Sequence, residues 1–194
     1  GIKRVEGKYT RALTNENGFI TGIQLESGQQ LDCDFIFDCS GFARLLLGKH
    51  FNEKWIDYKK YLPLDTALPF FIAHDGKNLP PYTEAIAMQY GWMWKIPVGN
   101  RYGCGYVFDS SYINEDQAKQ EVEQHLGLEI TSPKTFRFQA GRFENTLVKN
   151  CYGVGLAQHF VEPLEATSIW TFSVNLINFL KSGFIKRRIQ HRSA

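Results

Sequence analysis

Two glutamates, Glu162 and Glu165, flank a proline in the stretch "HFVEPLEATSIW", residues 159–170. Proline is disfavoured inside a helix but suits its first position, so the sequence predicts a helix that starts near Pro163. Apolar residues then recur at helical spacing, which predicts a long, largely buried helix running to about residue 183. A carboxylate in the first turn can polarise a neighbouring group strongly when its surroundings are apolar.

The start of this predicted helix is also a candidate anion site. The first N–H groups of a helix have no intrahelical partner, and the helix dipole places partial positive charge there. Thr167 and Ser168 follow Glu165 closely, so their backbone N–H groups could face the same point. A phosphate, a halide or an electron-rich ring edge would fit. Alternatively, both glutamates are ordinary first-turn acids of a core helix.

Two tryptophans in "GWMWKIP", residues 91–97, occupy alternate positions of a predicted strand. Trp92 and Trp94 therefore share one face of it, and we expect Pro97 to end it. Such a pair either packs in a core or forms a wall of flat apolar groups beside a bound ring system.

A third candidate is the end of the strand in "FIFDCSG", residues 35–41, where Asp38 is followed by Cys39, Ser40 and Gly41. Loops that follow buried strands often reach a ligand at the edge of a sheet. An ordinary turn is the other interpretation.

Several elements would position these residues. A capped helix is predicted over residues 114–127, with Asn114 as the N-cap and Gly127 as its end. Turn residues in "NENG" and "SGQ" predict a β-meander over residues 4–38. Later strands are predicted over residues 66–74, 83–97, 101–111, 134–141 and 148–157, the last of them buried and leading into the glutamate-bearing helix.

Composition excludes several classes of partner. The 194 residues carry 22 Lys and Arg against 20 Asp and Glu, a balance that gives no footprint for nucleic acid or an acidic membrane surface. No apolar run approaches the roughly 18 residues of a membrane span. The four cysteines lie far apart without zinc-ligand spacing, which indicates free thiols in a reducing cytoplasm and no metal site.

Taken together, the motifs resemble the flavin-dependent tryptophan halogenases. The resemblance covers essentially the whole chain but only the middle of the longer family sequences. It implies an α+β, flavoprotein monooxygenase-like fold, with residues 1–48 and 146–194 in an FAD-binding domain and residues 49–145 in a substrate-side sheet. The motifs that carry it are "DCSGF" (38–42), "GWMWKIP" with "RYGCGYVF" (91–108), "GRFENTLVKNCYGVGLA" (141–157) and "FVEPLEATSI" (160–169).

In that family, reduced FAD from a separate flavin reductase, oxygen and a halide yield hypohalous acid. A lysine then presents electrophilic halogen to tryptophan, an indole or another electron-rich aromatic. The sequence has no GxGxxG fingerprint and no lysine that matches the family's catalytic motif. We therefore expect the 194 residues to be part of a longer enzyme and to be inactive alone.

The resemblance assigns a role to each candidate residue. Glu165 resembles the catalytic glutamate, and Thr167 and Ser168 resemble the pair whose N–H groups hold the halide. The tryptophans resemble a barrier that keeps substrate away from the flavin. The residues on the flavin side would be Ser40, Gly41, Trp92, Trp94, Ile96, Pro97, Gly155 and Pro163.

Two other functions remain open from the sequence. A flavin monooxygenase or oxidase of the same fold would share most of these motifs, although the tryptophan pair argues against it. A protein that binds flavin or an aromatic ligand without turnover would also keep the apolar wall and the anion site.

Overall fold

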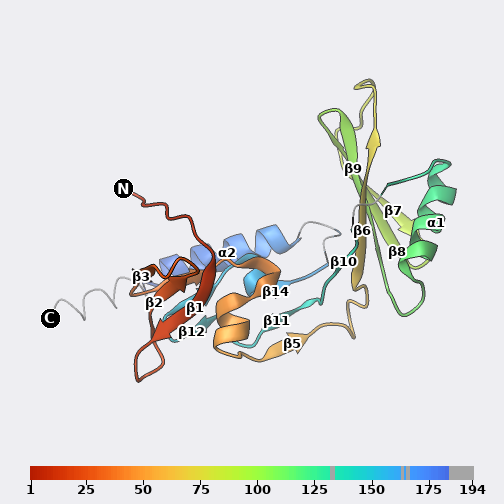
Figure 1. Cartoon of the computed structure of the whole chain (residues 1–194). Helices are drawn as coiled ribbons and strands as arrows, with labels where there is room; N and C mark the ends of the chain where they lie inside the picture. Colours follow the sequence, from red (N-terminus) through yellow and green to blue (C-terminus); the bar gives the residue numbers. More distant parts are fainter. Residues whose placement is uncertain (132–133, 163, 165–166, 184–194) are drawn as a thin grey trace. The chain divides into compact units, whose positions relative to one another are not determined.

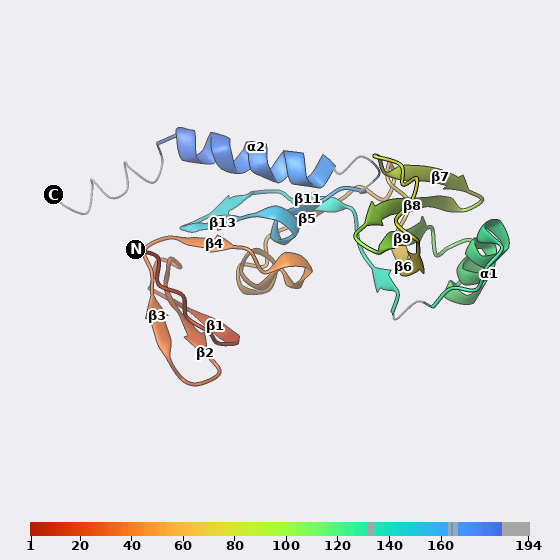
Figure 2. The same ribbon diagram turned by 90° about the horizontal axis from the view of Figure 1, so that it is seen from above.

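The computed structural model describes residues 1–131, 134–162, 164 and 167–183. Two compact units are present (Figures 1 and 2). The first contains Gly1–Ile56, Gly141–Val161 and helix α2 (Thr167–Lys181), and the second contains Asp57–Ala140 with Glu162. In the part of the chain that is described, no helix is both long and apolar enough to cross a bilayer.

The first unit begins with the predicted meander. Strands β1 (Tyr9–Thr14), β2 (Ile20–Leu25) and β3 (Gln30–Asp32) form an antiparallel sheet in that order. Gly18 and Gly28 have φ angles of 74° and 84°, so glycine suits the two connecting turns. These strands and turns confirm the first part of the prediction.

The last predicted strand of the meander is wrong, because the chain divides it between two sheets. Strand β4 (Ile36–Asp38) leaves the meander and pairs in parallel with β13 (Cys151–Gly153), which also pairs with β12 (Leu147–Val148). The buried Asn150 side chain explains the break. Its amide accepts from Ile20 N at 2.9 Å and donates to Ile20 O at 2.6 Å and Asp34 O at 2.9 Å, joining the sheets.

A third small sheet completes the first unit. Its order is β14 (His159–Phe160), β11 (Gly141–Phe143) and β5 (Trp55–Asp57). Strands β5 and β11 belong to one sheet, and the long segment of the second unit begins at Asp57 and ends at Ala140. Three short helices, η1 (Gly41–Ala43), η2 (Leu45–His50) and η3 (Gly155–Ala157), connect these strands.

Helix α2 packs along only one side within the first unit (Figure 2). The Phe179 ring stacks on Tyr152 with centroids 4.2 Å apart, and the Tyr152 hydroxyl donates to Asn175 O at 3.2 Å. The predicted burial of this helix is wrong, because the first unit leaves several apolar side chains of the helix uncovered. The exposed apolar side chains are Ile169, Trp170, Ile177 and Leu180.

The second unit is a five-stranded antiparallel sheet of order β10-β6-β9-β8-β7. Residues 83–97 form two strands rather than one, because the chain reverses at Gln89 and Tyr90. Pro97 does not end β8, since it lies beyond the last residue paired with β7 and its missing N–H removes no ladder bond. The strands are β6 (Thr66–Ala73), β7 (Glu84–Met88), β8 (Gly91–Val98), β9 (Arg101–Phe108) and β10 (Phe136–Arg137).

Helix α1 (Glu115–Leu126) covers one face of this sheet and agrees with its prediction (Figure 1). Asn114 forms a reciprocal capping box with Gln117, and Gly127 ends the helix in the left-handed conformation. The core between helix and sheet contains Leu68, Phe70, Met93, Cys104, Tyr106, Phe108, Ile113, Ala118, Val122 and Ile130.

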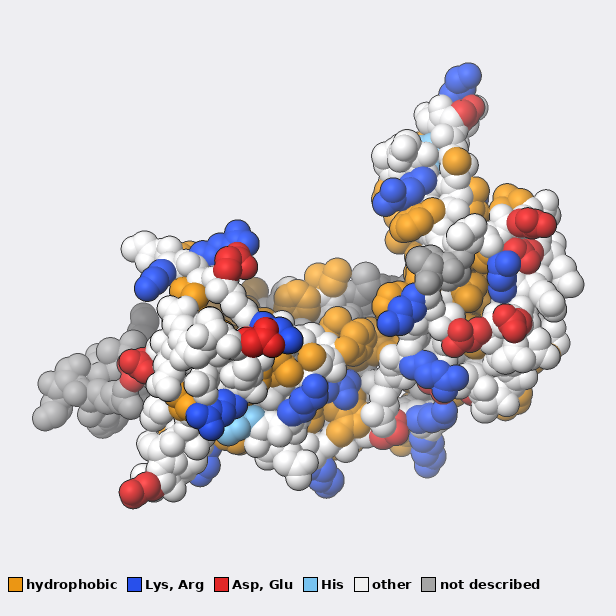
Figure 3. All heavy atoms as spheres, viewed as in Figure 1, with side chains coloured by type: hydrophobic (Ala, Val, Ile, Leu, Met, Phe, Trp, Pro, Cys, Tyr) orange, Lys and Arg blue, Asp and Glu red, His pale blue; other side chains and the backbone are white. Residues whose placement is uncertain are grey.

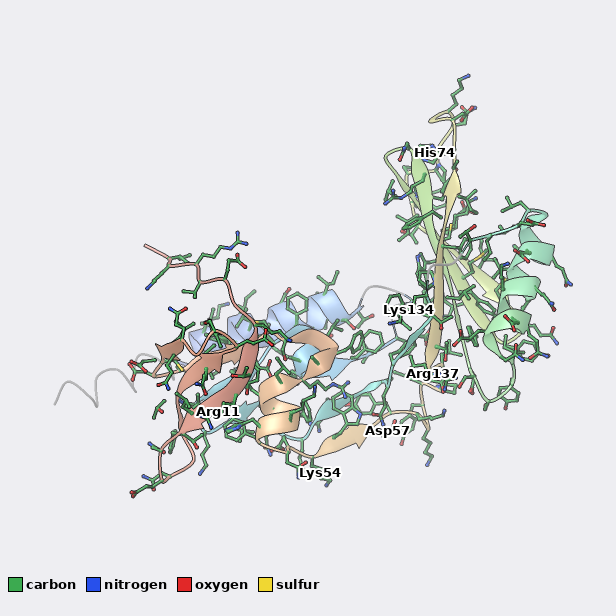
Figure 4. All side chains as sticks on the ribbon, viewed as in Figure 1. Arg11, Lys54, Asp57, His74, Lys134 and Arg137 are labelled. Carbon is green, nitrogen blue, oxygen red and sulfur yellow. The ribbon has the colours of Figure 1, made fainter. Side chains whose placement is uncertain are left out.

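The two ends of the second unit meet. The Gln139 side chain donates to Asp57, labelled in Figure 4, at 2.9 Å. Tyr58 and Ala140, the residues that follow Asp57 and Gln139, form a backbone hydrogen bond from Tyr58 N to Ala140 O at 3.0 Å. The segment 57–140 therefore begins and ends at the same place.

Candidate active site

The tryptophans lie on the sheet face of the second unit opposite α1. Trp92 is buried and Trp94 half-buried, with ring centroids 6.0 Å apart and planes tilted by 55°. Ala87 and Ala85 oppose them on β7. Small neighbours allow both indoles to lie across the sheet, which confirms that the pair shares one face.

Gly105 on β9 is the neighbour that lets the Trp94 ring lie flat. The two residues are register partners, and a methyl group at Gly105 would lie 2.1 Å from two ring carbons of Trp94. No real side chain tolerates such a contact. The wall of aromatic surface therefore depends on a glycine that sequence reasoning did not single out.

The tryptophan face continues into solvent-exposed apolar residues. Ile96 lies on it beyond Trp94 and is 37% exposed, while Pro97 points to the other face. On β6 the exposed Phe71 ring lies 4.2 Å from the guanidinium carbon of Arg101 on β9, and basic and hydrophobic side chains meet at this end of the sheet (Figure 3).

Glu162 also contributes to the second unit. Its carboxylate accepts a hydrogen bond from the Trp92 indole N–H. Partial burial raises the pKa of Glu162, and the bond from Trp92 acts in the opposite direction. The first glutamate of the motif thus holds a tryptophan, a role that no local sequence pattern indicates.

In the first unit, the carboxyl ends of the parallel strands β4 and β13 lie side by side, with Gly153 paired to Asp38. The loops that follow carry Ser40 and Gly41 on one strand and Gly155 on the other, and η1 contacts η3. Ligands of sheets with parallel strands bind at this edge. The structure therefore brings together three of the residues expected on the flavin side.

Gly41 and Gly155 leave open backbone at this edge. Their φ angles are 64° and 61°, which favour glycine, and no atom lies within 4 Å of the position that a Cβ would occupy at either residue. A ring or a phosphate can approach such backbone closely.

Asp38, which the sequence placed either in a ligand-binding loop or in an ordinary turn, organises the same edge. Its buried carboxylate accepts from Ser40 N at 3.0 Å, Ser40 Oγ at 2.6 Å, Leu46 N at 2.9 Å and Leu47 N at 3.1 Å. Ser40 Oγ in turn accepts from Leu45 N at 2.8 Å. The Ser40 hydroxyl therefore forms its hydrogen bonds within the loop itself.

Thr167 and Ser168 are the first two residues of α2, and this helix contacts η3. Their N–H groups belong to the first turn, where a helix has no intrahelical acceptors. Ser168 Oγ donates to Val161 O at 3.1 Å, so its hydroxyl holds the chain ahead of the helix. The backbone N–H groups are the donors that this arrangement offers to an anion.

Two candidates, Glu165 and Pro163, lie outside the described residues. A neighbour of the site, His159, is buried, and its Nδ1 bonds with the Gln158 side chain. Burial lowers the pKa of His159, which favours the neutral ring.

Comparisons with known proteins place the chain in one family. The model of the family described as tryptophan halogenase matches residues 1–193. The chain is 39% identical over 187 residues to tryptophan 6-halogenase ThaL of Streptomyces albogriseolus, covering 94% of this chain and 35% of that protein. It is 36% identical over 185 residues to tryptophan 7-halogenase KtzQ of Kutzneria sp. (strain 744), covering 93% of this chain and 34% of that protein.

A solved structure shows the same fold. BrvH, a flavin-dependent halogenase from Brevundimonas sp. BAL3, superposes with a TM-score of 0.86 at 34% identity, over 95% of this chain and 38% of BrvH. This similarity confirms the α+β fold of flavoprotein type. The chain spans about a third of the length of the curated relatives it matches. It belongs to the tryptophan halogenase family.

Proposed function

We propose that the protein containing this chain is an FAD-dependent halogenase. It would use reduced FAD, oxygen and a halide to halogenate tryptophan, an indole or another electron-rich aromatic. A separate flavin reductase would supply the reduced FAD, and the reaction would take place in the cytoplasm. The 194 residues alone would be inactive.

One observation carries this proposal. Helix α2, whose first residues are Thr167 and Ser168, contacts η3, which begins with Gly155 at the carboxyl edge of two parallel strands. An anion site formed by backbone N–H groups beside a flavin site suits a halide, because it needs no charged side chain.

The residues at that edge fit FAD. Gly41 and Gly155 have positive φ angles and open space where a Cβ would lie, so a flat ring could approach their backbone. Bound FAD supplies the oxygen-activating chemistry. In our proposal Thr167 and Ser168 hold the halide, Trp92 and Trp94 keep the aromatic substrate away from the flavin, and Glu165 polarises the oxidant on its way to substrate.

A backbone substitution tests the halide site. Proline is tolerated in the first turn of a helix but has no N–H, so Thr167→Pro deletes one donor, whereas Thr167→Ala keeps it. In the full-length protein with FAD, reductase, oxygen and tryptophan, we expect Thr167→Pro to lower kcat/KM for bromide roughly tenfold or more, as for loss of one charge-assisted hydrogen bond. Thr167→Ala should stay within about twofold.

Product mass distinguishes the alternatives in the same assay. A halogen-dependent mass gain supports a halogenase, and Glu165→Gln should abolish it while FAD binding persists. Oxygen incorporation that is independent of halide would replace the proposal with a monooxygenase. Retained FAD binding without any product from wild type would favour a protein that only binds its ligands.

A further inference from the structure

A cavity of about 410 Å³ in the second unit lies apart from the residues considered so far. Tyr90, at its wall, packs against the core between the sheet and α1, whereas the tryptophans lie on the other sheet face. The volume is within the range of sites for small ligands. Its lining residues are Pro63, Leu64, Gln89, Tyr90, Gly91, Asp109 and Tyr112.

Asp109 gives this cavity a negative charge. The residue is only 7% exposed. Its Oδ1 accepts from Ser111 N at 2.9 Å and Ser111 Oγ at 2.7 Å, and among the described residues no basic side chain forms an ion pair with it. The charge of Asp109 helps to raise the pKa of Lys59, but the Lys59 ammonium forms its ion pair with Asp65 at 3.0 Å. A buried carboxylate without a cation of its own is costly and attracts one.

Two tyrosine rings line the same cavity as this carboxylate. The rings of Tyr90 and Tyr112 are nearly parallel, with centroids 6.3 Å apart and planes 22° from each other. Backbone bonds tie both residues to Asp109, from Asp109 N to Tyr90 O at 3.2 Å and from Tyr112 N to Asp109 O at 3.1 Å. Tyr112 is 71% exposed, so part of its ring surface is open to a ligand.

We propose that this cavity binds a primary alkylammonium group. The Asp109 carboxylate would accept from the ammonium, the tyrosine faces would attract its positive charge, and Pro63 and Leu64 would contact the alkyl chain. Two sources carry this chemistry: a free amine, or a lysine side chain from a part of the polypeptide outside residues 1–194. This site does not depend on the proposed halogenase reaction.

Ligand-observed saturation-transfer NMR on the full-length protein tests the free amine. The probe is n-butylammonium chloride, and the neutral control is n-butanol. We expect saturation transfer to butylammonium only, with affinity reduced about tenfold by Asp109→Asn and about threefold by Tyr112→Ala. Tyr61→Ala is the matched control, since Tyr61 is 76% exposed and does not line the cavity.

A lysine from the same polypeptide would instead block the probe. In that case wild type shows no saturation transfer, and acetic anhydride modifies one lysine other than Lys59 faster in both Asp109→Asn and Tyr112→Ala than in wild type. The exposed position of Tyr112 keeps this second variant informative if Asp109→Asn fails to fold. Absence of both signals, or equal probe binding by wild type and both variants, overturns the proposal.

Discussion

The indole N–H of Trp92 donates a hydrogen bond to the Glu162 carboxylate, which lies 70 positions later in the chain. This bond attaches the first glutamate of the motif to the tryptophan strand. The two glutamates are therefore not equivalent: Glu162 has a described partner on the second unit, and Glu165 is the one proposed for chemistry.

The first prediction concerns the acceptor role of Glu162. Glu162→Leu would leave the buried Trp92 N–H without a partner, so we expect it to destabilise the protein by about 1–3 kcal/mol. Glu162→Gln keeps an oxygen acceptor and should cost less than about 0.5 kcal/mol near pH 4. Denaturant unfolding of the full-length protein, followed by tryptophan fluorescence, measures both; equal losses would show that the acceptor is unimportant.

The pH dependence of the Gln variant is a second prediction. The pKa of Glu162 in the folded protein is raised above its ordinary value of 4.5, chiefly by burial. The folded state therefore binds the Glu162 proton more tightly than the unfolded state does. The stability that Glu162 contributes falls as the pH rises through its pKa in the folded protein. Because glutamine does not ionise, Glu162→Gln should gain stability relative to wild type between about pH 4 and about pH 7. A difference that does not change with pH contradicts this.

Gly105→Ala tests the packing of the Trp94 ring against the backbone of β9. The added methyl group would overlap that ring, so we expect a loss of roughly 1–3 kcal/mol and an altered near-ultraviolet circular dichroism spectrum. Gly103→Ala is the control two residues earlier on the same face, where the nearest atom is Val98 Cγ2 at 3.9 Å. Similar effects of the two substitutions would count against the proposed packing.

Asn150→Ala tests the junction between the meander and the parallel pair. The change removes two buried hydrogen bonds and one partly buried bond and leaves Ile20 N without its acceptor, so we expect a cost of about 3 kcal/mol. Asn145→Ala, which loses only one exposed side-chain hydrogen bond to Glu53, should cost less than about 1 kcal/mol. Urea unfolding midpoints of the two variants compare them directly, and equal midpoints would refute the role of Asn150.

Helix α1 could be predicted closely because its signals are local. The Asn114 cap, the first-turn acids and the terminal Gly127 all act within a few residues of the helix. The shared face of Trp92 and Trp94 was equally accessible, since it follows from the alternation of side chains along a strand.

Other features depend on residues far away in the sequence. The break between β3 and β4 requires Asn150, whose bond to Ile20 spans 130 positions. The flat placement of the Trp94 ring requires Gly105 on the neighbouring strand. The hydrogen bond between Trp92 and Glu162 joins two sequence motifs that show no relationship in the sequence alone. Periodicity showed that α2 is apolar but not which of its sides would find a partner.

The return of residue 140 to the side of residue 57 has a consequence for the order of folding. Residues 57–140 contain a complete sheet, a helix and their core in one continuous segment, so this unit can form as soon as it has left the ribosome. The first unit must wait, because β4 pairs with a strand made more than a hundred residues later. Until β13 has been made, the backbone groups of β4 that pair with it stay unpaired, and such groups favour aggregation.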